Sequence, residues 1–284
     1  MSKIIRGFVV VVLMAVLFGL TSSAIPAYAV SLPFVEHFNN TSSWGTIPYT
    51  IGGVSAPAPT VDSSQNAPDS PGGSLRFTFP VGWPPGYEPG KAWCSVPQVE
   101  ELWTEYWFKY SDGFQFQPVT NKHVYWVLGS SEKEGDFTLM TDGSRKMWMG
   151  PQPKGGTSTA FYANKSYNPT IETGVWYKAT VHIKLNTSTS PYNGVFQLWI
   201  NDTQVMDHNN VNYRTNTYIN SKIGTLELVP VWGGSGGSNK AKIDYFWLDA
   251  IRLQTTSFDI NSGGGGGVTS NPPPMAPTGL NITN

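Results

Sequence analysis

Residues 101–128 bring aromatic rings, charged groups and an imidazole together at spacings that could bind a ligand. If residues 101–110 form a strand, alternation puts two tryptophans, a glutamate and a lysine on one face: Trp103, Trp107, Glu105 and Lys109. The opposite face of that strand is apolar. Such a combination suits a sugar, because ring faces pack on its C–H groups while charged groups bond to its hydroxyls. This face is therefore predicted to contact carbohydrate.

Basic side chains stand at the start of the next expected strand and farther along the chain. Asn121 is followed by Lys122 and His123, a cation and an imidazole that could bind an anionic group and accept a proton. Arg145 and Arg214 occur in later segments that could line the same surface. These cations favour an acidic glycan as the partner.

The 11 tryptophans are more than a core of this size needs, and those in the central part of the chain divide into two predicted sets. The set expected to stack on sugar is Trp103, Trp107, Trp126 and Trp148. The set expected to fill the core is Trp176, Trp199 and Trp247.

Sequence motifs of several other chemistries are absent. The paired acids of jelly-roll glycosidases, Glu-x-Asp-x-x-Glu, do not occur, and the acidic run at 132–136 lies among turn residues that predict a solvated loop. The chain has no nucleophile elbow of the Gly-x-Ser-x-Gly type in a strand-to-helix context, no His-Glu-x-x-His and no phosphate loop. No two histidines have metal-ligand spacing.

Composition excludes further classes of protein. The chain has 284 residues, with 18 Lys and Arg against 19 Asp and Glu and a formal net charge of −1. Binding of nucleic acid requires clustered cations, which this balance does not supply. An aromatic content of 13% with only 13% charged residues is unlike that of a disordered chain. The single cysteine, Cys94, is predicted to be a buried small residue, and it excludes a disulfide within the chain.

Period-two alternation is the main secondary-structure signal. In 176–185, apolar side chains from Tyr177 to Leu185 fall on one face and polar ones on the other; 75–79 and 195–201 alternate in the same way. No window shows a helical apolar stripe, and Gly, Pro and Asn-Gly turns separate the strands. The sequence therefore predicts an all-β fold, a jelly-roll β-sandwich of two antiparallel sheets.

Three segments are expected along the chain. Residues 1–29 have the basic start, apolar run and Ala-Tyr-Ala end of a secretory signal peptide, which predicts a secreted or cell-surface protein that keeps no membrane segment after cleavage. Residues 30–258 form the sandwich, and 259–284 form a linker and tail that contains five consecutive glycines and three prolines. The sandwich is expected to be a monomer.

The order of several segments resembles the concanavalin A-like jelly-roll polysaccharide lyases of the glucuronan and alginate lyase type. The segments that carry the resemblance are YWFKY at 106–110, NKH at 121–123, GVWY at 174–177, HIKLN at 182–186, NGVFQLWIND at 193–202 and DYFWLD at 244–249. The resemblance implies a concanavalin A-like sandwich. It is specific for the fold and only weakly specific for activity, because the same scaffold carries lectins and binding modules.

The resemblance also implies cleavage of uronic-acid chains by β-elimination. Lys122 would hold the substrate carboxylate, His123 would be the nearest base, and Arg214 or Arg145 would be a second partner of the carboxylate. The sequence departs from the family where Leu-Pro-Gly follows the lysine, because His-Val-Tyr stands at 123–125. An arginine and paired tyrosines of the family also lack counterparts on the next two expected strands.

Two functional classes therefore stay open, a lyase and a non-catalytic carbohydrate-binding or adhesion domain; a structural envelope protein ranks third. A structural calcium ion is a further candidate, because jelly rolls of this kind often tie the first strand to the last through oxygen ligands. Glu36 and Asp249 are the residues placed for that role. No other cofactor is expected.

Overall fold

The computed structural model describes residues 28–68, 70–129, 134–234 and 237–259, and nearly all of its regular structure is β-strand. One short 3-10 turn, Asn216–Tyr218, is the single helical element in these residues. No helix in the described part of the chain is long and apolar enough to cross a membrane. The predicted signal peptide and tail lie almost entirely outside the described residues.

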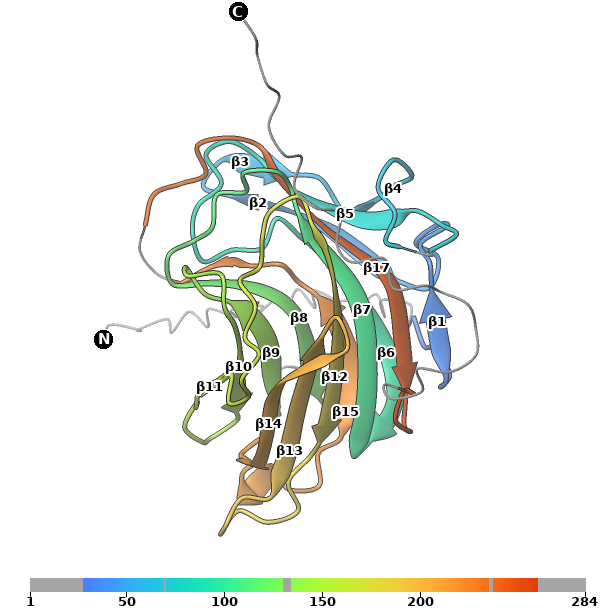
Figure 1. The fold of residues 1–284 in the computed structure, drawn as a ribbon, viewed down its shortest axis with the longest axis vertical. Coiled ribbons are helices and arrows are strands. Elements are labelled where there is room, and N and C mark those ends of the chain that lie inside the picture. Colours follow the sequence, from blue (N-terminus) through green and yellow to red (C-terminus); the bar gives the residue numbers. More distant parts are fainter. Residues whose placement is uncertain (1–27, 69, 130–133, 235–236, 260–284) are drawn as a thin grey trace, which may run out of the picture.

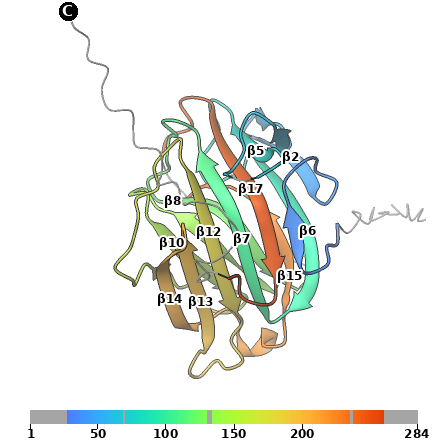
Figure 2. The same ribbon diagram turned by 45° about the vertical axis from the view of Figure 1, so that its right-hand side comes forward.

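The strands form two antiparallel sheets, which are the layers of the sandwich in Figures 1 and 2. The eight-stranded sheet contains, in spatial order, β14 (Thr203–Val211), β13 (Gly194–Ile200), β12 (Trp176–Lys184), β7 (Glu101–Tyr110), β17 (Asp244–Gln254), β5 (Ser74–Phe79) and β4 (Thr60–Asp62), with β1 (Phe34–Glu36) also paired to β17.

The nine-stranded sheet contains β11 (Phe161–Tyr162), β10 (Met147–Pro153), β9 (Gly135–Thr141), β8 (Thr120–Leu128), β15 (Ile223–Leu228), β6 (Gly90–Val99), β2 (Gly45–Ile51) and β3 (Val54–Ala56), with β16 (Trp232–Gly233) paired to β8. Both sheets combine consecutive strands with neighbours that are far apart in sequence, such as β15 between β8 and β6. The predicted all-β jelly-roll sandwich is confirmed.

The core lies between the sheets and is built from alternate residues of each strand. On β7, Tyr106, Phe108 and Tyr110 are at most 2% exposed. The predicted inward faces of 176–185 and 195–201 are buried in the same way. Each large apolar side chain removed from water contributes about 1.5–3 kcal/mol to folding, so this interior needs no disulfide.

Cys94 lies on β6 within this core and is fully buried, as predicted. Burial raises the pKa of its thiol to about 12. The thiol therefore stays protonated and acts as a small apolar side chain.

Candidate functional site

The outer face of the nine-stranded sheet carries a groove of about 300 Å³. Six strands of this sheet contribute to it, from β2 at one side to β10 at the other. Its lining is mostly polar: Tyr49, Gly86, Glu88, Lys91, Lys122, Tyr125, Asp136, Gln152, Glu227, Val229 and Val231.

A β-bulge on β8 brings Lys122 and Tyr125 to this face together. The pairing of β8 with β9 shifts between Lys122 and Val124, so both residues point outward although they are three positions apart. The Lys122 ammonium lies 5.1 Å from the centre of the Tyr125 ring, and the Lys122 amide donates to the Val231 carbonyl at 2.9 Å. The groove thus holds a cation beside a phenol.

An ion pair lies on the next two strands of the groove, and its carboxylate residue, Glu227, pairs in register with Tyr125. The Lys91 ammonium on β6 donates to a Glu227 carboxylate oxygen on β15 at 2.5 Å. Their side chains are 18% and 11% exposed, which leaves both within reach of a ligand. Lys91 also lies over the Trp93 ring, 5.8 Å from its centre.

A second, apolar hollow of about 270 Å³ adjoins the groove and shares Lys122 and Gln152 with it. Trp148 on β10 forms part of its lining, and the Trp148 ring stacks on Tyr162 with centres 5.8 Å apart and planes 22° apart. Tyr162 is 58% exposed. The structure therefore brings together two of the predicted site residues, Lys122 and Trp148, and adds an aromatic platform beside the polar groove.

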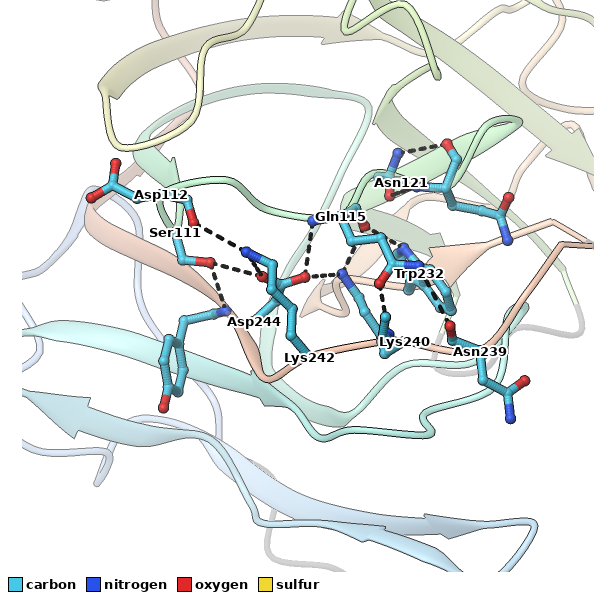
Figure 3. Close-up of polar contacts among 12 residues, drawn as sticks. Ser111, Asp112, Gln115, Asn121, Trp232, Asn239, Lys240, Lys242 and Asp244 are labelled. Carbon is cyan, nitrogen blue, oxygen red and sulfur yellow. Dashed lines mark hydrogen bonds and ion pairs between the residues drawn. The ribbon is translucent and has the colours of Figure 1, made fainter.

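The loop before β8 is held by a buried polar network, shown in Figure 3. The Asn121 amide side chain accepts from the Gln117 amide at 2.9 Å and donates to the Gln117 carbonyl at 3.2 Å. The Gln115 carbonyl accepts from the Trp232 indole and from the Lys240 ammonium, each at 2.8 Å. These bonds fix the backbone from which Lys122 extends.

His123 faces the interior, on the other side of β8 from the groove. It is fully buried, and its Nε2 lies 2.7 Å from the Tyr110 hydroxyl and 2.8 Å from the Thr141 hydroxyl. Burial lowers its pKa to about 3. The predicted role of His123 as a base that contacts substrate therefore has no support in its position, because the two sheets enclose the imidazole.

The buried imidazole should make the fold sensitive to acid. An exposed imidazole has a pKa of 6.5, so below that value the unfolded chain gains a proton that native His123 takes up only near pH 3. Its stabilising contribution is complete above about pH 6.5 and falls by up to about 1.4 kcal/mol for each pH unit below. We expect urea unfolding of His123→Gln to show a smaller loss of stability from pH 7 to 5 than the parent protein. Equal losses would contradict this.

Arg214 and Arg145 do not line the groove. Arg214 is 1% exposed, and its guanidinium donates to the Asn186 and Ser221 carbonyls and to Glu100. It therefore clamps three loop segments together. Arg145 lies in the turn between β9 and β10, at φ 63°, and pairs with Glu172 at 2.5 Å.

Of the four predicted stacking tryptophans, Trp148 alone lines the groove or the hollow beside it. Trp103 and Trp107 are on the outer face of the eight-stranded sheet, where Trp103 stacks on His182 with centres 4.1 Å apart. Trp126 is fully buried between the sheets, and its indole donates to the Thr104 hydroxyl at 2.9 Å.

The prediction of a tryptophan core set is wrong for Trp176 and Trp199, whereas Trp247 is buried as predicted. Trp176 and Trp199 are partly exposed on the outer face of the eight-stranded sheet. Trp247 is 7% exposed but faces the same side, where its indole donates to Asp62 at 3.0 Å. Trp176 and Trp247 flank Lys109, whose ammonium lies 5.9 and 5.7 Å from the two ring centres.

The carboxylates proposed for calcium are already surrounded by hydrogen-bond donors. Glu36 accepts from the Phe38 amide and the Trp44 indole, and Asp249 accepts from three donors that include the Ala67 amide. In the described residues no three His, Cys, Asp or Glu side chains are grouped to hold a metal ion. These N–H and O–H donors already stabilise the negative charge of the two carboxylates, whereas a calcium site needs six to eight oxygen ligands that face the ion. Calcium here stays a prediction, tested by melting with and without a chelator.

Several groove residues escaped the sequence-based prediction: Tyr49, Glu88, Lys91, Tyr125, Asp136, Gln152 and Glu227. A local signal was present at Glu227, which stands between the buried Leu226 and Leu228 and must therefore face outward. Nothing local shows that β6, β8 and β15 are neighbours, and that adjacency assembles the groove.

The two antiparallel sheets form a jelly-roll sandwich, and several solved structures with a similar fold carry names that concern polysaccharides. The endo-β-1,4-glucuronan lyase from the fungus Trichoderma reesei matches with a TM-score of 0.53 and 16% identity, over 78% of this chain and 95% of the other. The alginate lyase vAL-1 from Chlorella virus matches at 0.52 and 12%, over 70% and 89%. The cellulose-induced protein Cip1 matches at 0.53 and 11%, over 78% and 97%.

The resemblance to jelly-roll polysaccharide lyases is thus confirmed for the fold. No family model and no curated protein matches the sequence. At these identities the likeness concerns architecture, and activity must be argued from the groove itself.

Proposed function

We propose that the groove of the nine-stranded sheet binds a segment of a polysaccharide chain. The main support for this proposal is that the polar groove and the apolar hollow lined by Trp148 are adjacent and share Lys122 and Gln152. A chain of sugars presents alternating hydroxyl edges and C–H faces, and adjacent polar and aromatic subsites serve both. The polysaccharide-related names of the structural neighbours support this proposal.

In this proposal the side chains that line the groove and the hollow have different roles in binding. Glu227, Asp136 and Gln152 accept from sugar hydroxyls, while Lys122 donates to a ring or hydroxyl oxygen. The Trp148 ring, supported by Tyr162, packs against the face of a neighbouring sugar. Binding without cleavage is the function that these residues support best, because the one histidine near Lys122 is enclosed by the two sheets.

Lyase activity is the second candidate, and the contact between Lys122 and Tyr125 is the observation that favours it. In β-elimination a base removes the C5 proton of a uronate, its electron pair forms the C4–C5 double bond, and the C4–O bond breaks. The departing oxygen then takes a proton. Lys122 would neutralise the uronate carboxylate, and Tyr125 would accept the C5 proton as a phenolate and then donate it, as a phenol, to the departing oxygen. Absorbance of the unsaturated uronate tests this reaction directly.

Substitution of the groove residues should weaken polysaccharide binding. We expect Trp148→Ala and Lys122→Ala each to reduce affinity about tenfold, equivalent to about 1.4 kcal/mol, in calorimetry or affinity electrophoresis. Trp107→Ala is the matched control, because it removes a partly exposed tryptophan from the outer face of the other sheet. If Trp107→Ala alone reduced the affinity for polysaccharide, the binding surface would lie on the eight-stranded sheet and the proposed binding site in the groove would be wrong.

We also propose that the protein is secreted and that it is a monomer. The described residues contain no membrane-spanning helix, and the signal pattern at 1–29 supports export. A mature N-terminus at Val30 in exported protein, and a monomer mass in light scattering, are the expected results.

A further inference from the structure

We infer that the groove is built for a neutral polysaccharide rather than a uronate chain. This inference rests on the proposed binding function of the same groove and names its class of ligand. The observation behind it is the set of charges in the lining: two cations, Lys91 and Lys122, face three carboxylates, Glu88, Asp136 and Glu227. The formal charge of the lining is therefore 2 − 3 = −1.

Lys91 is already committed to a carboxylate. Its ammonium lies 2.5 Å from Glu227 on the neighbouring strand, and the two side chains are largely buried. An ammonium in such a pair has its charge compensated locally, and a uronate could recruit it only by displacing Glu227. Lys91 therefore adds little attraction for an acidic sugar.

The other basic residues predicted to favour an acidic glycan are engaged elsewhere. Arg145 pairs with Glu172 in a turn, and the Arg214 guanidinium is buried among loop carbonyls and Glu100. Neither lines the groove. Lys122 is then the one predicted cation that lines the groove. Because Lys91 and Glu227 compensate each other, a uronate chain would bring one negative charge per sugar toward the carboxylates of Asp136 and Glu88.

The same side chains suit a neutral sugar well. A carboxylate accepts two hydrogen bonds from neighbouring hydroxyls, and Gln152 can donate and accept at once. Because the charged acceptors are partly withdrawn from solvent, bonds from hydroxyls to them are stronger than bonds between neutral groups. The Trp148 platform adds a contact that does not depend on charge.

Matched pairs of polysaccharides test the inference. Each pair has one linkage and differs by a carboxylate at C6: β-1,4-glucan and β-1,4-glucuronan, β-1,4-mannan and β-1,4-mannuronan, α-1,4-galactan and α-1,4-galacturonan. Calorimetry with soluble oligosaccharides of each should show binding at least tenfold tighter for the neutral member of the pair that is recognised. Tighter binding of the uronate member would overturn the inference and leave the proposed function intact. No binding to any member would refute both.

Charge substitutions in the groove provide the second measurement. The variant Glu88→Gln/Asp136→Asn removes two negative charges, and we expect it to shift the affinity ratio toward the uronate member at least fivefold, with the shift reduced at high salt. Glu172→Gln, which removes a carboxylate outside the groove, should leave the ratio unchanged. Melting curves establish that each variant is folded. An unchanged ratio in a folded Glu88→Gln/Asp136→Asn would show that the carboxylates do not select the ligand.

Discussion

Replacing Lys240 with methionine is expected to lower the free energy of unfolding by about 3 kcal/mol, since removal of one partner leaves a buried charge without its main compensation. The Lys240 side chain is almost fully buried, and its ammonium lies 2.7 Å from Asp244 and 3.5 Å from the centre of the Phe114 ring. Asp244 is itself fully buried. After the substitution it keeps only the partly exposed Lys242 as a cationic partner, at 3.3 Å.

Urea unfolding of matched variants separates the charge effect from loss of packing. Lys242→Met removes a lysine from the same carboxylate but at an exposed position, so its effect should stay below about 1 kcal/mol. Lys240→Met/Asp244→Asn should recover part of the lost stability because the uncompensated charge is gone. If Lys240→Met and Lys242→Met had equal effects, the burial of the pair would not be the cause.

Loss of the ion pair between Lys240 and Asp244 should also reduce polysaccharide binding in the groove. The Lys240 ammonium and the Trp232 indole share the Gln115 carbonyl, and that loop leads into β8 (Figure 3). We therefore expect weaker polysaccharide binding by Lys240→Met at temperatures where it is still folded, although the ammonium itself does not line the groove.

Replacing Arg214 with leucine should destabilise the fold by about 2–6 kcal/mol, because it leaves the Asn186 and Ser221 carbonyls without their donor, at about 1–3 kcal/mol each. Glu100 adds little to this cost, since its side chain is 47% exposed and can be hydrated. The guanidinium bonds to the Asn186 carbonyl through two nitrogens, and the Asn186 side chain in turn bonds to the Arg214 backbone at both its amide and carbonyl. Any loss of ligand binding in Arg214→Leu should follow loss of folded protein. Thermal melting and calorimetry on the same sample measure both.

Arg145→Gln is the control for Arg214. Its ion pair with Glu172 is exposed, so its removal should change stability by less than about 1 kcal/mol. A folded Arg214→Leu with an unchanged melting temperature but no binding would restore Arg214 to the ligand site and contradict its structural role.

Sequence alternation predicted the two faces of β7 correctly but could not say what each face meets. Trp103 and Trp107 do share the outer face, yet that face belongs to the eight-stranded sheet, and Lys122 lies on the outside of the other one. Alternation has a period of two residues, so it shows which side chains share one side of a strand but not which sheet the strand joins. Which outer face is hollowed depends on the packing of distant strands.

Alternation along a strand accounts for the outward position of two tryptophans. Because Tyr177 and Ala179 are inward, Trp176 had to point outward, and the same argument applies to Trp199 between Leu198 and Ile200. The inward position of Trp126 does not follow from the local sequence, since the bulge between Lys122 and Val124 changes the phase of β8 and nothing in the local sequence marks it. The family resemblance predicts Lys122 as a site residue, whereas Glu227 and Lys91 belong to the site because β15 and β6 lie next to β8.

The single thiol of this chain gives every variant above the same internal reporter. Cys94 is fully buried on β6, between β15 and β2, and the raised pKa of its thiol keeps it unreactive in the native protein. A thiol reagent can therefore modify only molecules whose β6 has separated from its neighbours. The rate of labelling measures how often the sandwich opens, with no engineered probe and in the presence or absence of a bound polysaccharide.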